Sequence, residues 1–202
     1  MPRRALTFGI CALAFAACLQ MSAAAEEGQP SAAQMMDDLM YGRGTIGGPF
    51  TLTDQNGHKR SDSEFHGKLM IVYFGYTFCP DVCPADLMAI TQALDALGPL
   101  AGNVQPIFIT IDPERDTPLL KEYVSAFHKS FIGLTGSSEE IRKLANAYKA
   151  FYAKVPGAAG DYRIDHTGVI YFIGKGGEYL GFVPPQTDPE RLTEILRKYL
   201  AK

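Results

Sequence analysis

The chain has 202 residues, four of them cysteine, and a formal net charge of −3 at pH 7. That length suits a single domain. Because the charge balance is mildly acidic and no basic cluster is present, we predict no binding to nucleic acid.

The N-terminus has the layout of a secretory signal. Arg3 and Arg4 precede a largely apolar stretch over residues 5–19, and Ala23–Ala25 supply small residues. A positive start, an apolar middle and an A-x-A site predict a signal peptide over residues 1–25. We therefore expect an extracytoplasmic protein in a bacterial periplasm, either soluble or tethered to the inner membrane. In the tethered case an uncleaved segment would be the anchor, although it is shorter than the roughly 20 apolar residues of a spanning helix.

Cleavage after Ala25 would remove Cys11 and Cys18. The remaining 177 residues would carry a net charge of −5 and only two cysteines, Cys79 and Cys83. Outside the cytoplasm such a pair is by default a structural disulfide bond. A bridge that closes so short a loop removes little entropy from the unfolded chain, so a redox-active dithiol is the favoured interpretation.

Residues 26–46 are polar and rich in Met and Gly, without a sustained apolar period, and we predict a flexible lead-in there. The domain then covers residues 47–202. Its strands alternate with helices and end in a hairpin and a last helix, which predicts an α/β, thioredoxin-like fold: a central mixed sheet flanked by helices, with an N-terminal β-hairpin. The predicted strands are Phe50–Thr53, His58–Arg60, Leu69–Phe74, Val104–Ile111 and Phe131–Leu134, followed by Tyr162–Ile164, Val169–Ile173 and Tyr179–Val183 as one antiparallel edge; the predicted helices are Ala85–Leu97, Pro118 to about His128 with Thr117 as its cap, Ser137–Phe151 and Asp188–Leu200.

Cys79 and Cys83 lie in the turn between a buried strand and a helix. The N-terminus of a helix offers free backbone N–H groups and the positive end of a dipole, which lower the pKa of a cysteine. Thiolates attack disulfides and bind soft metals. The spacing differs from the C-x-x-C of thioredoxin-like enzymes, because three residues separate the two sulfurs. Positions four apart share one face of a helix, so both sulfurs can point at one acceptor.

Of the four histidines, His166 stands out because the loop before a terminal hairpin lies against the active-site turn in a thioredoxin fold. Two thiolates and one imidazole favour copper or zinc over magnesium, calcium or manganese. Copper(I) accepts two or three soft ligands, whereas zinc normally takes four. The residues therefore favour a copper ion on Cys79, Cys83 and His166, with zinc open if water or a partner residue completes the set.

Two functions from different classes fit these residues. In the first, the chain is a metallochaperone that passes copper to cysteines of an acceptor and is not an enzyme in the usual sense. In the second, it is a thiol-disulfide oxidoreductase in which Cys79 attacks a disulfide and Cys83 resolves the mixed disulfide. A copper sensor or buffer is a third interpretation, and a peroxidase has no independent support in the sequence.

The residues resemble the Sco/SenC family of copper chaperones from about Gly47 to the C-terminus. The C-x-x-x-C-P element and the later D-H-T carry most of this resemblance. The matching segments are Gly47–Phe50, Tyr73–Pro84, Thr110–Thr117, Leu134–Gly136 and Asp165–Thr167.

The resemblance implies a thioredoxin-like fold, an extracytoplasmic location and copper held by Cys79, Cys83 and His166. It also implies a role in maturing the binuclear copper centre of cytochrome c oxidase, by delivering copper, by reducing the target's cysteines, or both. The copper-bearing subunit of the oxidase would then be the main partner. A thiol reductant or another copper chaperone would be a second one.

The segment Asp112–Asp116 belongs to the same resemblance, but its chemistry is less specific. We expect its carboxylates to make turn and cap hydrogen bonds around Pro113 and Pro118. The alternative is that they orient a ligand or meet a partner. Tyr73, Tyr76 and Phe78 are expected to be mainly packing residues, with a second role as an aromatic rim around the sulfurs.

Overall fold

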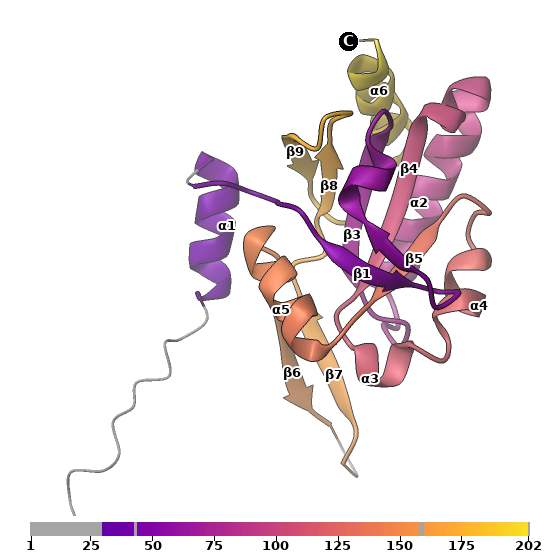
Figure 1. The fold of residues 1–202 in the computed structure, drawn as a ribbon. Helices are drawn as coiled ribbons and strands as arrows, with labels where there is room; N and C mark the ends of the chain where they lie inside the picture. The colour runs from indigo at the N-terminus through magenta and orange to yellow at the C-terminus, as the bar shows by residue number, and fades with distance from the viewer. Residues whose placement is uncertain (1–29, 43, 158–159, 202) are drawn as a thin grey trace, which may run out of the picture. The chain divides into compact units, whose positions relative to one another are not determined.

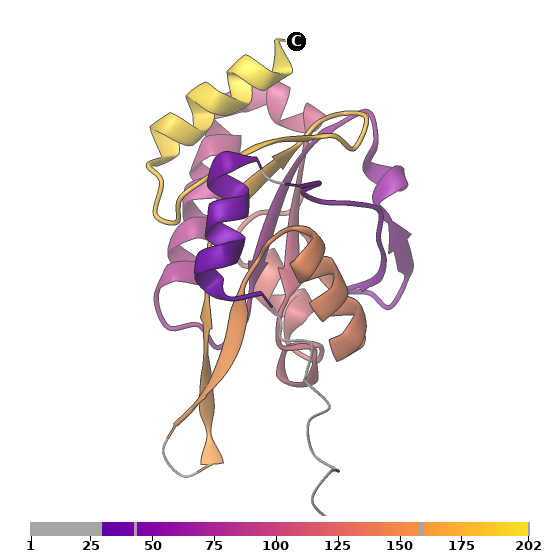
Figure 2. The same cartoon turned by 90° about the vertical axis from the view of Figure 1, so that its left-hand side faces the viewer.

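A computed structural model describes residues 30–42, 44–157 and 160–201, and its fold is a mixed α/β sheet with helices on both faces (Figures 1 and 2). The seven strands of the main sheet run in the order β2-β1-β5-β4-β3-β8-β9. Strands β1 and β2 form the predicted N-terminal hairpin. With the central mixed sheet and its flanking helices, this arrangement confirms the predicted thioredoxin-like fold class. The strands of this sheet are β1 (Thr51–Asp54), β2 (Lys59–Ser61), β3 (Leu69–Gly75), β4 (Val104–Thr110), β5 (Ile132–Thr135), β8 (Ile170–Ile173) and β9 (Tyr179–Val183).

Helix α2 (Val82–Leu97) packs with α6 (Pro189–Leu200) on one face of the sheet, and α5 (Ser138–Ala147) lies on the other (Figures 1 and 2). The described residues contain no helix that is both long enough and apolar enough to cross a membrane. The predicted signal peptide over 1–25 lies outside the described residues. The shorter helical elements are α1 (Ala32–Tyr41), α3 (Pro113–Asp116), α4 (Leu120–Ser125) and the 3₁₀ turns Asp62–Phe65 and Gly98–Asn103.

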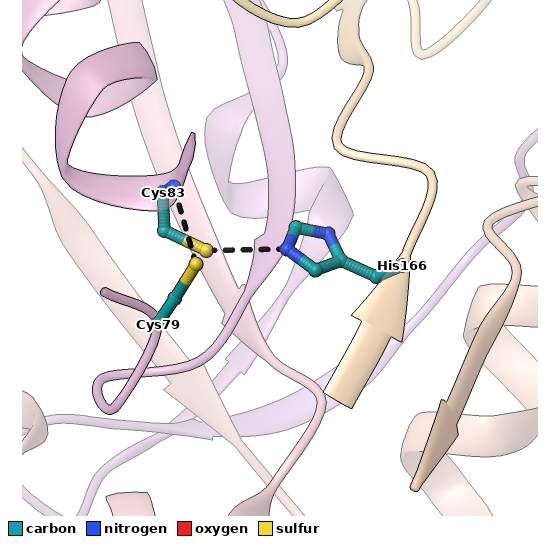
Figure 3. A group of neighbouring side chains, drawn as sticks. All are labelled: Cys79, Cys83 and His166. Carbon is teal, nitrogen blue, oxygen red and sulfur yellow. Dashed lines mark hydrogen bonds between the residues drawn. The ribbon is translucent and has the colours of Figure 1, made fainter. Parts of the chain in front are cut away.

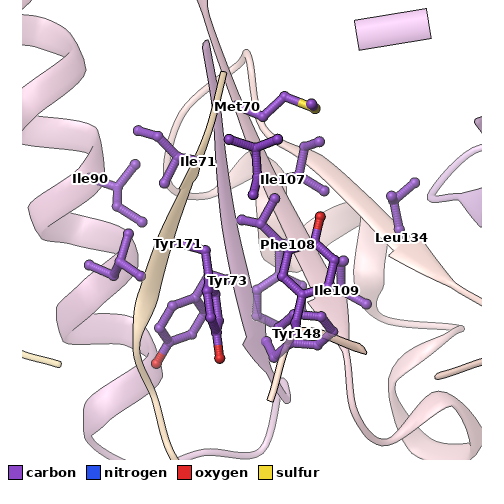
Figure 4. Close-up of a cluster of buried hydrophobic side chains, with 14 of the residues drawn as sticks. Met70, Ile71, Tyr73, Ile90, Ile107, Phe108, Ile109, Leu134, Tyr148 and Tyr171 are labelled. Carbon is purple, nitrogen blue, oxygen red and sulfur yellow. The ribbon is translucent and has the colours of Figure 1, made fainter. Parts of the chain in front are cut away.

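The core is centred on the parallel pair β3 and β4, in which every residue is buried. Strands that are covered on both faces have nearly continuous apolar sequences, which is why β3 and β4 could be predicted from the sequence. Figure 4 shows side chains of these strands packing against α2 on one side and Tyr148 and Leu134 on the other. The largest fully buried side chains include Tyr73, Phe108 and Tyr171.

The predicted lead-in over 26–46 contains a helix that the sequence analysis missed, α1. It opens with a capping box on Ser31, and its buried residues Met35 and Leu39 are one turn apart. Two apolar positions on a short helix give too weak a period to recognise from sequence. Helix α1 belongs to the same compact unit as the main sheet, and this unit begins at Ser31.

The predicted antiparallel edge of three strands is wrong in one respect. Strands β8 and β9 do form the edge of the main sheet, but β7 (Tyr162–His166) pairs with β6 (Tyr152–Pro156) in a separate two-stranded sheet. We call β6 and β7 together the histidine ribbon. β6 was missed because its residues are only partly buried and therefore lack a clear alternation of apolar and polar side chains.

The helix predicted from Pro118 to about His128 is also different in the structure. Pro113 begins a short helix, α3, and a second helix, α4, begins only at Leu120. Thr117 does not cap a helix start. Its hydroxyl instead donates a hydrogen bond to the carbonyl of Pro113, at 2.6 Å.

Candidate metal centre

The segment Tyr76–Cys83, which we call the cysteine turn, leaves the end of β3 and enters α2. Cys83 is the second residue of α2 and is fully buried, whereas Cys79 is half-buried. Both are free thiols. Gly75 makes this burial possible, because a Cβ atom there would lie 2.9 Å from the Cys83 Sγ atom.

His166, the last residue of β7, completes a group of three soft donors (Figure 3). Its Nε2 atom lies 3.4 Å from the Cys83 Sγ atom. The ligand atoms of Cys79, Cys83 and His166 all lie within 4.8 Å of one another. Within the described ranges this is the only cluster of three or more Cys, His, Asp or Glu side chains with such spacing. The structure thus brings together all three residues that the sequence predicted.

The imidazole of His166 is held mainly by aromatic packing. Its ring stands edge-on to the rings of Tyr73 and Tyr76, with centroid distances of 6.3 and 5.9 Å. Its Nδ1 atom is buried and has no hydrogen-bond partner among the described residues. Histidines that bind metals usually donate this second N–H to an orienting partner. The ring must therefore be positioned by its packing and by the strand that carries it.

The two cysteines have opposite acid–base behaviour. Hydrogen bonds from Cys83 and His166, together with the backbone N–H groups of Asp81 and Cys83, lower the pKa of the Cys79 thiol to about 3. Burial raises the pKa of the Cys83 thiol above its ordinary value, and the neighbouring Cys79 adds to the effect. At neutral pH the pair holds one ready thiolate on Cys79. A metal that binds both sulfurs would release the Cys83 proton.

A buried carboxylate beneath the site was missed in the sequence analysis. Asp86, fully buried on α2, accepts hydrogen bonds from the Tyr73 hydroxyl (3.0 Å) and from the backbone N–H of Gln186 (2.6 Å). Burial raises its pKa. Because Tyr73 also interacts with Cys83, this network joins α2, β3 and the segment after β9 behind the sulfurs. The sequence did contain a signal that could have identified Asp86: it is an acidic residue three positions after Cys83, on the apolar face of a helix.

The carboxylates of the 112–116 segment make structural hydrogen bonds, but not the expected turn and cap bonds, because the Asp112 side chain makes no cap hydrogen bond to α3. Asp116 accepts hydrogen bonds from the backbone N–H and hydroxyl of Thr77 and from the hydroxyl of Thr110, so it ties the cysteine turn to β4. Asp112 pairs with Arg115 and accepts hydrogen bonds from the Tyr162 hydroxyl. Neither carboxylate belongs to the three-residue cluster.

The remaining histidines lie elsewhere. Each of the other three has a ring nitrogen near a carboxylate oxygen of an aspartate, at 3.8 Å for His58, 3.6 Å for His66 and 3.8 Å for His128. They take no part in the cluster of Cys79, Cys83 and His166.

Comparison with known proteins agrees with this geometry. The family model described as SCO1/SenC matches residues 40–201. An SCO2-like protein of Rickettsia felis is 43% identical over 155 residues, which are 75% of this chain and 76% of the relative. Among solved structures, Bradyrhizobium japonicum ScoI with copper bound has 45% identity and a TM-score of 0.69, covering 77% of this chain and 99% of that one. Arabidopsis thaliana ScoI with copper bound has 38% identity and a TM-score of 0.73, covering 78% of this chain and 99% of that one.

Proposed function

The chain belongs to the SCO1/SenC family, and from that membership and the geometry of its site we propose that it is a copper metallochaperone. Cys79, Cys83 and His166 bind one copper ion as cargo. The observation that carries the proposal is the approach of two sulfurs and one imidazole nitrogen to within 4.8 Å of one another. Two similar proteins, the ScoI proteins of B. japonicum and A. thaliana, have been solved with copper bound.

The donor set suits copper(I), which is stable with two or three soft ligands. Zinc would need a fourth ligand, and the described residues place no further Cys, His, Asp or Glu in this cluster. Cys79 is only partly buried and is the donor that an acceptor can reach first, while Cys83 is fully buried. Transfer by ligand exchange therefore begins at Cys79 and ends at Cys83.

The family resemblance supports the copper-bearing subunit of cytochrome c oxidase as the proposed acceptor, whose cysteines would receive the cargo. The proposed location is the bacterial periplasm, which the family resemblance and the signal-like N-terminus support, with residues 1–25 either cleaved or retained as an anchor.

Thiol-disulfide exchange is the second candidate, and the unequal thiols favour it. The Cys79 thiolate would attack one sulfur of a substrate disulfide, form a mixed disulfide and release a substrate thiolate. Cys83 would then lose its proton, attack the Cys79 sulfur and release the second substrate thiolate. The product is a Cys79–Cys83 disulfide bond, and a thiol reductant must reduce it before copper can bind again.

The His166→Ala variant separates the two functions. The copper-loaded protein is mixed with the reduced soluble domain of the oxidase's copper-bearing subunit, and copper transfer is followed optically. In parallel, the reduced copper-free protein is mixed with the oxidised acceptor, and acceptor thiols are counted. A metallochaperone loses copper affinity and transfer in the variant while disulfide reduction persists. Absence of transfer by the wild type, with equal reduction by both proteins, would contradict the copper function.

A further inference from the structure

The position of His166 depends on a ribbon that is not part of the main sheet. Strands β6 and β7 pair only with each other. Tyr162, Ile164 and His166 alternate along β7 and so share one face of it. This face is turned inward: Ile164 is buried, His166 meets Cys83, and the Tyr162 hydroxyl meets Asp112. Contacts along this face therefore decide where the imidazole stands relative to the sulfurs.

Arg115 is the residue that touches both halves of the site. It lies on α3, beside β7 (Figure 1). Its guanidinium carbon lies 3.6 Å from the ring centroid of Tyr162 and 5.0 Å from that of Phe78, the neighbour of Cys79. Arg115 also donates hydrogen bonds to the carbonyl of Tyr162 and the carboxylate of Asp161, both at 3.1 Å. One side chain thus joins the cysteine turn to the histidine ribbon.

We call Arg115 together with the two rings that it contacts, Phe78 and Tyr162, the bracket. Asp112 fixes this bracket to the body of the protein. This carboxylate is 1% exposed, lies two residues after the end of β4 and pairs with the Nε atom of Arg115. It also accepts hydrogen bonds from the Tyr162 hydroxyl, at 2.8 and 3.0 Å to its two oxygens. The Nζ atom of Lys154, on β6, lies 3.8 Å from an oxygen of the same carboxylate. A buried anion with these partners gives the ribbon a fixed point on the main sheet.

We propose that Arg115 is a positioning residue for the metal centre: by stacking between Phe78 and Tyr162 on its anchor Asp112, it sets the approach of His166 to Cys79 and Cys83. The inference rests on the proposed copper function. Lysine cannot take this place, because it lacks the planar group that stacks on two rings while donating in fixed directions. The missing partner at His166 Nδ1 makes the bracket more important, since among the described residues no hydrogen bond orients the ring from the side opposite the sulfurs.

The test compares Arg115→Ala and Arg115→Lys with the wild type by anaerobic competition titration of the reduced protein with Cu(I). Loss of a residue that orients a metal ligand typically lowers affinity 10- to 100-fold, so Arg115→Ala should bind copper about 10-fold more weakly. Arg115→Lys should recover little of that loss. In a His166→Ala background, Arg115→Ala should cause no further loss. X-ray absorption should show weaker nitrogen ligation in Arg115→Ala, with sulfur ligation retained.

Arg60 offers a matched control. Its side chain is 27% exposed against 22% for Arg115, its guanidinium carbon lies 5.0 Å from the Phe65 ring, and it pairs with Glu64. It lies on β2, at the far edge of the main sheet. Arg60→Ala should leave copper affinity unchanged.

Two further measurements keep the outcomes distinct. In the copper-free protein, hydrogen exchange at the Ile164 amide should be faster in Arg115→Ala than in Arg60→Ala. If Arg115→Ala unfolds, the pair Asp112→Asn with Arg115→Met removes the bracket without leaving an unpaired buried carboxylate. Full affinity in all Arg115 variants, beside weakened binding in His166→Ala, would overturn the inference alone. A wild type that binds no copper would overturn the proposed function as well.

Discussion

The cysteine turn and the histidine ribbon supply one site, but different kinds of contact hold them. Cys83 is packed into the core against Gly75, at the end of a strand whose every residue is buried. His166 lies on a two-stranded ribbon that buries Ile164 in the core but is also attached through polar groups, among them the Tyr162 hydroxyl and the N–H of Ile164. Apolar packing fixes position with many small contacts, whereas a few hydrogen bonds can be lost one at a time. We therefore expect the sulfurs to be the rigid half of the site and the imidazole to be the adjustable half.

Among the variants that test this comparison, Gly75→Ala should have the largest effect on stability and copper binding. An added Cβ atom would meet Cys83 Sγ, a ring atom of Phe108 and a ring atom of Tyr73, each at 2.9 Å. Overpacking of this kind costs about 1–3 kcal/mol, and the collision also displaces a metal-binding sulfur. Chemical denaturation should show the loss of stability, and Cu(I) titration should show weaker binding. The control is Gly102→Ala, because Gly102 has open space around it. Normal copper affinity in Gly75→Ala would show that the cysteine turn is less rigid than we infer.

A second test concerns the pH dependence of the buried carboxylate below the cysteine turn. Burial raises the pKa of Asp86 in the folded state, so the folded protein holds this proton more tightly than the unfolded chain does. The contribution of Asp86 to stability is therefore greatest below the unfolded pKa of about 4 and falls as pH rises through the folded pKa. Asp86→Asn removes this dependence. The stability difference between wild type and variant should be largest at low pH and should shrink as pH rises, as measured by denaturation at a series of pH values. A difference that grows with pH would contradict the raised pKa.

The smallest effect is expected for Tyr76→Phe, which weakens only one attachment of the ribbon. The Tyr76 hydroxyl accepts a hydrogen bond from the Ile164 N–H at 3.3 Å. Loss of one such bond costs about 0.5–1.5 kcal/mol, and it should appear as faster hydrogen exchange at Ile164. Tyr123→Phe is the matched control, since the buried Tyr123 hydroxyl has no hydrogen-bond partner among the described residues. Equal exchange rates in the two variants would mean that Tyr76 does not hold the ribbon.

The same contrast explains what the sequence could predict. The cysteine turn was predictable because β3 and α2 have clear apolar patterns on either side of it, and the two cysteines stand together in the chain. His166 was assigned from the expected fold and the family resemblance. The ribbon that carries it was not foreseen, because β6 is short and only partly buried. Its contacts with Asp112 and Arg115 also join residues far apart in the chain, which local patterns cannot reveal.

The central claim is that two sulfurs and one imidazole form a single copper site. The most direct measurement is anaerobic Cu(I) titration of the reduced protein and of His166→Ala, with X-ray absorption to identify the ligands. We expect one copper ion per chain with two sulfur ligands and one nitrogen ligand, and loss of the nitrogen in the variant. Failure to bind copper stoichiometrically, or unchanged ligation without His166, would contradict the account.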